Sequence, residues 1–112
     1  MPNAIVTTDG SNKPITLSIA EQRGHHIQTI IRINNQPFAE KEGDVTDLPV
    51  GTNAIQSGTT IAITTTAVKI SPAQDSVVVF TLDGANEPHE DISTRQFNGD
   101  TVVTHHMTYD FL

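Results

Sequence analysis

Polar and apolar residues alternate along three segments of the chain, which is the pattern of strands with one buried face. In segment 15–20 the odd positions are apolar: Ile15, Leu17 and Ile19. In segment 25–34 the odd positions are occupied by His25, Ile27, Thr29, Ile31 and Ile33. In segment 102–111 they are occupied by Val103, His105, Met107, Tyr109 and Phe111. The sequence therefore predicts three strands whose odd-numbered residues face a core.

The segment Thr59–Ile70 is rich in β-branched residues, which are stiff at χ1 and fit a pleated sheet better than a helix. Its apolar residues change parity, because Ile61 and Ile63 are odd whereas Val68 and Ile70 are even. A regular strand cannot bury all four. The pattern predicts a bulge midway along this strand, or a strand that bends from one sheet into the other.

Two further stretches depart from simple alternation. The segment Ser76–Leu82 is apolar at odd and even positions, which predicts a central strand covered on both faces or a strand at a subunit contact. Residues 35–58 are the least regular part, and a connection this long needs elements of its own. We expect one or two short edge strands, around Phe38 and around Thr52–Ile55, because proline cannot donate to a ladder and so suits sheet edges. The region as a whole is expected to be a crossover between two sheets. A short first strand is expected at Ala4–Thr8.

A turn is predicted between the strands at 15–20 and 25–34. The residues Gln22–Gly24 are expected to form a three-residue hairpin loop with the glycine in the left-handed conformation, which sets Ile19 opposite Ile27. A two-residue loop would instead bring polar side chains to the core face, since a one-residue slip turns over the whole strand. The predicted hairpin also places Glu21 opposite His25, where a carboxylate would favour the charged imidazole.

Asn98-Gly99 is the strongest hairpin signal in the chain and predicts a type I′ turn between strands at 92–97 and 100–111. Altogether the 112 residues hold about seven such strands. We predict one domain over residues 1–112 with an all-β fold, an antiparallel two-sheet β-sandwich of about seven strands. An immunoglobulin-like arrangement is one form that fits, although the Cys and Trp hallmarks of a true immunoglobulin domain are absent.

The composition excludes several classes of function. Thirteen acidic residues against six basic ones give a formal net charge of −7, which argues against nucleic acid and anionic membranes as partners. The absence of cysteine excludes disulfides, zinc–thiolate sites and thiol catalysis. No segment approaches the ~20 apolar residues of a membrane span, and the chain starts without a signal-peptide pattern. We expect a cytoplasmic protein, or one exported without a classical leader, unless the chain has been trimmed.

Histidines and carboxylates are the candidate ligands for a metal ion. The adjacent pairs His25–His26 and His105–His106 lie within strands, so the two rings of each pair point to opposite faces and cannot chelate one ion. A zinc site would need residues from different strands, for example His26 with His106, or His25 with His105. Two acidic loops, Glu40–Asp47 and Asp83–Asp91, offer oxygen ligands for calcium, although without the order of an EF-hand. The candidate metal ligands are His26, His106, Asp83, Glu87, Glu90 and Asp91.

No catalytic motif stands out, and in particular no Gly-x-Ser-x-Gly elbow is present, so we do not expect an enzyme. No bound cofactor is expected. The predicted function is a non-catalytic β-sandwich module that acts through protein–protein contacts or self-association, in an assembly, adhesion or accessory role. This prediction rests on the apolar residues to spare in Val77–Leu82 and Val103–Phe111, because exposed edges and apolar faces are how such domains pair. The alternative is an ion- or small-ligand-binding domain that uses the strand histidines or the acidic loops.

Overall fold

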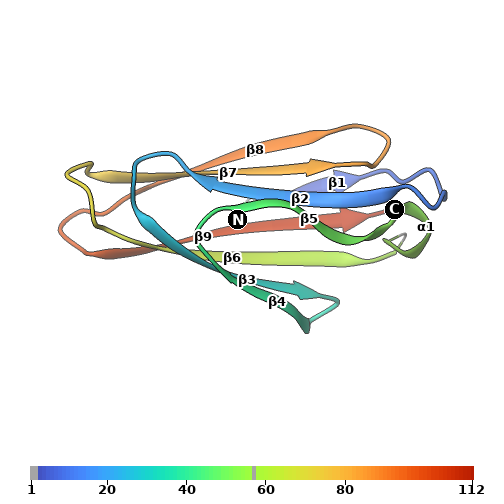
Figure 1. Cartoon of the computed structure of the whole chain (residues 1–112), viewed down its shortest axis with the longest axis horizontal. Helices are drawn as coiled ribbons and strands as arrows, with labels where there is room; N and C mark the ends of the chain where they lie inside the picture. The colour runs from blue at the N-terminus through green and yellow to red at the C-terminus, as the bar shows by residue number, and fades with distance from the viewer. Residues whose placement is uncertain (1–2, 57) are drawn as a thin grey trace.

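Two β-sheets lie face to face in a computed structural model that describes residues 3–56 and 58–112 (Figure 1). The five-stranded sheet contains, in spatial order, β1 (Asn3–Val6), β9 (Val102–Phe111), β6 (Thr60–Val68), β3 (His26–Ile33) and β4 (Gln36–Glu42). The four-stranded sheet contains β5 (Val45–Thr52), β2 (Pro14–Glu21), β7 (Asp75–Asp83) and β8 (His89–Gln96). The predicted all-β two-sheet sandwich is confirmed. Within the described residues it has nine strands, more than expected, and one pair, β1 with β9, is parallel.

The core between the sheets is mainly aliphatic. Its fully buried side chains alternate along the strands, and the largest are Tyr109, Phe80, Phe97, Ile15, Leu17, Ile19, Ile27, Ile31, Ile61, Ile63, Leu82 and Met107. The inner faces predicted for β2, β3 and β9 are therefore confirmed, with Ile33 and Val103 half-buried near the strand ends. Strand β9 lies inside its sheet, between β6 and β1, which fixes the position of its buried polar residues.

The predicted bulge in β6 is wrong, and so is the alternative that this strand bends into the other sheet. The strand pairs with β3 and with β9 in continuous register, and its odd-numbered residues face the core throughout. Val68 and Ile70 point outward instead, with 37% and 69% of their surface exposed. The core accepts Thr65 at an inner position because its hydroxyl is 2.9 Å from that of Thr29 on β3, so neither polar group lacks a partner.

The predicted hairpin between β2 and β3 is also wrong, because these strands lie in opposite sheets. The chain passes from one sheet to the other at this loop (Figure 1). Gly24 has the expected left-handed conformation, with φ of 81°. Glu21 does not pair with an imidazole. Its Oε1 accepts the backbone N–H groups of Arg23 and His25, at 2.6 and 2.9 Å, and so holds the loop in shape.

The turn at Asn98-Gly99 forms as predicted, but it does not join two paired strands. Both residues have positive φ, 50° and 89°, and the N–H of Asp100 donates to the carbonyl of Phe97 at 2.8 Å. The strand before the turn, β8, pairs with β7, whereas β9 pairs with β6 and β1. Strand β8 also begins at His89, three residues earlier than expected. The turn therefore connects the two sheets.

The crossover predicted for residues 35–58 is confirmed, because β4 ends one sheet and β5 ends the other. Both edge strands are longer than expected, and each contains a proline, Pro37 and Pro49. The strand expected around Thr52–Ile55 is wrong, since the helical turn α1 (Asn53–Gln56) follows β5 directly. The buried amide of Asn53 donates to the carbonyls of Lys13 and Gly84. Within the described chain, no helix has the length and apolar character to cross a membrane.

Candidate functional site

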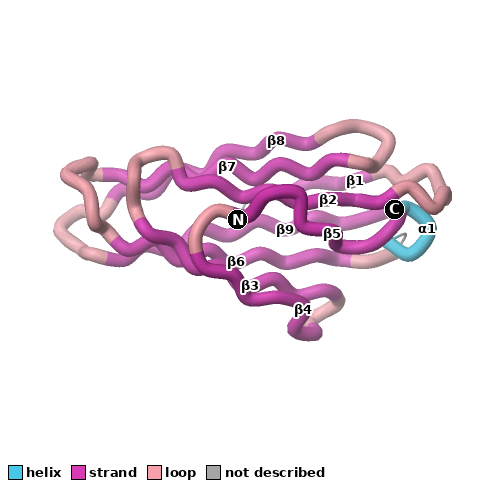
Figure 2. The backbone as a smooth tube through the Cα atoms, in the orientation of Figure 1, coloured by secondary structure: helices cyan, strands magenta, loops and turns pink. Residues whose placement is uncertain are grey.

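Four strands end the two sheets, and they differ in how readily another strand can pair with them. Strand β4 carries Pro37 and a register shift against β3, and β5 carries Pro49 and two register shifts against β2. Strand β1 has only four residues. Strand β8, at the margin of the fold in Figure 2, runs for eight residues beside β7 with continuous register and without proline. It is the long regular edge of the sandwich.

The inner face of β8 is polar. Its residues pair with the inward-facing positions of β7, and they are His89, Asp91, Ser93 and Arg95. Three of them contact β9. The hydroxyl of Ser93 is 2.8 Å from Nδ1 of His105. Asp91 Oδ2 lies 3.5 Å from the hydroxyl of Tyr109, and the ring of His89 meets the Tyr109 ring edge to face with centroids 6.3 Å apart. These contacts attach the edge strand to the opposite sheet.

A chain of hydrogen bonds continues from Ser93 into the core. Nε2 of His105 is 3.0 Å from the hydroxyl of Ser76, which donates to Oε2 of Glu21 at 2.9 Å. Because a carboxylate only accepts, Ser76 gives its hydrogen to Glu21 and accepts one from Nε2–H of His105. Nδ1 of His105 then accepts from Ser93. The network therefore fixes one tautomer of a neutral, fully buried imidazole.

The pKa values of this region agree with that assignment. Burial, and then the charge of Arg95, lower the pKa of His105 to about 4, while Glu21 opposes the shift and His106 adds to it. Burial alone would raise the pKa of Glu21, but its hydrogen bonds from His25, Ser76, Arg23 and Val77 outweigh burial and lower it. Burial, and then the nearby Asp91 carboxylate, raise the pKa of the Tyr109 hydroxyl above its ordinary value.

The outer face beside this edge carries an apolar row. Ala20 of β2 is paired with Val79 of β7, and Val79 is paired with Ile92 of β8. The side chain of Val79 is half-buried, whereas 63% of Ile92 is exposed. Of the apolar outer positions of Ser76–Leu82, Val77 is buried and Val79 is half-buried, so the row is mainly exposed where it ends at Ile92 on the free edge.

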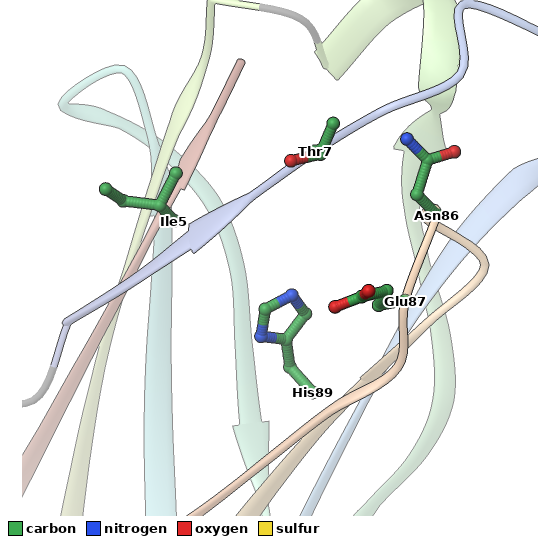
Figure 3. A pocket seen from close by; sticks show the side chains of 5 residues that line it. All are labelled: Ile5, Thr7, Asn86, Glu87 and His89. Carbon is green, nitrogen blue, oxygen red and sulfur yellow. The ribbon is translucent and has the colours of Figure 1, made fainter.

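A small cavity opens between β1 and the start of β8 (Figure 3). Its volume is about 220 Å³, and it is lined by Ile5 and Thr7 on one side and Asn86, Glu87 and His89 on the other. The carboxylate of Glu87 and the ring of His89 both turn into the space between the two strands (Figure 3). The arrangement offers a hydrogen-bonding acceptor and an imidazole to a small polar ligand.

The structure does not bring the predicted metal ligands together. His26 and His106 both lie on the outer face of the five-stranded sheet, but they pair with Val68 and Thr64 of β6, so they are offset by about 13 Å along the strands. His25 is buried and bonded to Asp75, Ile70 and Ser71, apart from the partners of His105.

The acidic candidates also separate. On β8, Glu90 points outward and Asp91 inward, Asp83 ends β7, and Glu87 lies at the cavity. Across residues 3–56 and 58–112, no three His, Asp or Glu side chains are grouped closely enough to hold a metal ion.

Three polar residues of the β8 region were not anticipated: Ser76, Ser93 and Arg95. A signal for Ser76 was present, because alternation along Ser76–Leu82 places a hydroxyl on the core face, where it needs a partner. The partners of Ser93 and Arg95 depend on which strand lies opposite, and local sequence does not determine that.

Comparison with known proteins adds no relative. No family model matches the chain, and no curated protein or solved structure gives a significant match.

Proposed function

We propose that the protein is a non-catalytic β-sandwich module that acts through protein–protein contacts, and that the free edge of β8 is where an extended partner strand adds. The observation that carries the proposal is the contrast among the edges. Proline or register shifts interrupt β4 and β5, whereas β8 offers eight residues in continuous register. Proline and bulges are two of the means by which native sheets protect an edge, and β8 has neither.

Strand addition combines two kinds of contact. Backbone N–H and C=O groups of the partner bond to the free edge, which gives affinity that does not depend on sequence. Side chains of the partner lie beside those of β8 and supply specificity. On the outer face they would meet Ile92 at the end of the apolar row, and on the inner face they would meet Asp91 and Arg95.

The buried hydrogen-bond chain supports a structural role over catalysis. A general base needs to reach substrate and to titrate near the working pH. The ring of His105 is fully buried, its two nitrogens are occupied by Ser93 and Ser76, and its pKa is about 4. We therefore propose that this chain of hydrogen bonds holds β8 against β9.

Assembly, adhesion and accessory roles are all consistent with this proposal. The immunoglobulin-like form also stays a prediction. The two-sheet architecture supports this form. In the sequence, the paired strands β7 and β8 come between β6 and β9, which are neighbours in the opposite sheet.

A second candidate function rests on the cavity between β1 and β8, where Glu87 and His89 converge. There the protein would bind a small polar ligand or, with help from water, a cation. Thermal melts with calcium and with zinc provide the test, because binding to the folded state raises the midpoint. A rise that Glu87→Gln and His89→Gln each abolish supports the site, and an unchanged midpoint at millimolar ion contradicts it.

Site-specific photo-crosslinking tests the leading proposal. Benzoylphenylalanine replaces Thr94 on β8 or, as a matched control, Lys41 on β4; both positions are exposed on edge strands. In cells that make the protein, irradiation should give a defined cross-linked protein from position 94 and none from position 41. Absence of cross-links from position 94, or the same products from both positions, contradicts the proposal.

A further inference from the structure

We propose that the strand that adds to β8 is β8 of a second copy of this chain. The two strands would be antiparallel, with a two-fold axis at Ser93, so that Ser93 lies opposite Ser93 of the second copy. This inference rests on the proposed function, since it names the partner of the same edge. It would join two four-stranded sheets into one continuous sheet, with the same surface contributed by both copies, as two-fold dimers require.

Geometry limits the registers of such a pair. Backbone groups of a strand point alternately to its two neighbours, so residues directly opposite each other share the same orientation toward the free edge. In a symmetric pair of identical strands, one residue must therefore lie opposite its own copy, and the two-fold axis passes between these two copies. The four central choices are Asp91, Ile92, Ser93 and Thr94.

Charge selects one of these registers. An axis at Ser93 sets Asp91 opposite Arg95 of the second copy, and the symmetry repeats this pair. An axis at Asp91 would oppose two carboxylates, which is destabilising. An axis at Ile92 leaves Asp91 opposite a serine, and an axis at Thr94 leaves it opposite Phe97. Only the axis at Ser93 makes opposite charges meet, and it uses seven of the eight residues of β8.

The outer face fits the same register. There the pairs would be Ile92 with Thr94 and Glu90 with Gln96, each formed twice by symmetry. The two Ile92 side chains become diagonal neighbours, within reach of each other across the strands. Because 63% of Ile92 is exposed in the single chain, the contact would cover the free end of the row formed with Ala20 and Val79.

The dimer should be weak. A single pair of seven-residue strands buries less surface than a standard stable interface, and each copy carries a formal charge of −7. We therefore expect association that depends on concentration and that is measurable at chain concentrations up to about 1 mM.

A charge swap tests both the partner and the register. Arg95→Asp sets carboxylate against carboxylate in a homodimer, and Asp91→Arg sets guanidinium against guanidinium. Each single variant should weaken self-association roughly tenfold or more, because two favourable pairs become unfavourable. An equimolar mixture of the two variants should restore it, since the heterodimer has opposite charges at both pairs. Sedimentation equilibrium measures all three, with circular dichroism to verify the fold of each variant.

A control variant on β4 and a second variant on β8 separate the possible outcomes of the charge swap. Lys41→Asp makes the same charge change on β4 and should leave association unchanged. If Asp91→Arg fails to fold through its contact with Tyr109, Ile92→Lys replaces it as a β8 variant expected to be monomeric. A wild-type chain that is monomeric at about 1 mM overturns the inference, as do single variants that dimerise like the wild type.

The cross-linking at Thr94 separates this inference from the proposed function. A product of twice the chain mass supports both. A product with another protein alone overturns the dimer but retains the contact function, and no product contradicts both.

Discussion

Strands β4 and β8 are both edge strands, yet they differ in the side chains of their inner faces and in the regularity of their pairing. Strand β4 contributes Ala39 to the core and is interrupted at Pro37 by a register shift. Strand β8 contributes polar side chains at alternate positions and has no interruption. Its contacts with β9 depend on that regularity, because a bulge would turn Asp91 or Ser93 to the other face. A polar inner face can thus require a regular edge strand, and within the described residues this edge has no neighbouring strand.

The largest expected effect concerns β9, the strand that anchors β8. Met107→Asp should lower the free energy of unfolding by about 4 kcal/mol or more, or prevent folding, because it places an unpaired carboxylate in the core. Thr108→Asp, on the outer face, should cost less than about 1 kcal/mol. Urea unfolding measures both variants. Equal losses would mean that β9 is covered on both faces.

The next effect is the pH dependence contributed by His105. Its pKa is about 4 in the folded protein, below the ordinary histidine value of 6.5, so the unfolded chain binds more protons between these limits. Stability should therefore fall as the pH drops from 6.5 toward 4, by about 2–3 kcal/mol at pH 4.5 relative to pH 7. His105→Gln should flatten the slope of urea-derived stability across this window. An unchanged slope contradicts the neutral, buried assignment.

A smaller effect separates the two faces of β8. Ser93→Ala leaves Nδ1 of His105 without its donor and should cost about 1–2 kcal/mol. Thr94→Ala, on the outer face, should change stability by less than about 0.5 kcal/mol. Urea unfolding gives both values. A loss from Thr94→Ala as large as that from Ser93→Ala would contradict the inner anchoring of the strand.

Which face of a strand is buried could be predicted from sequence, but which strands pair could not. Alternation alone placed Ile15, Ile27 and Met107 in the core, because side-chain period is a local property. Gly24, Asn98 and Gly99 have the expected positive φ values. The same turn geometry serves a hairpin or a passage to the other sheet, and only packing of the whole chain decides between them.

The proposed interaction edge was predictable only in part. The apolar surplus of Val77–Leu82 indicated a contact surface, and its outer positions do lie beside β8. The histidines and acidic loops suggested metal ligands, but strand order separates them. The anchoring role of Ser93 depends on β9 lying opposite β8, a long-range relation that no local pattern contains.

Amide hydrogen exchange, followed as a function of chain concentration, tests the central claim that β8 is the edge open to a partner. In a monomer, no strand among the described residues pairs with the free-edge amides of β4 or β8. Protection of alternate β8 amides should increase with concentration while protection of the β4 amides stays constant. Increased protection at β4 and not at β8, or no change at either edge, would contradict pairing of a second copy at β8.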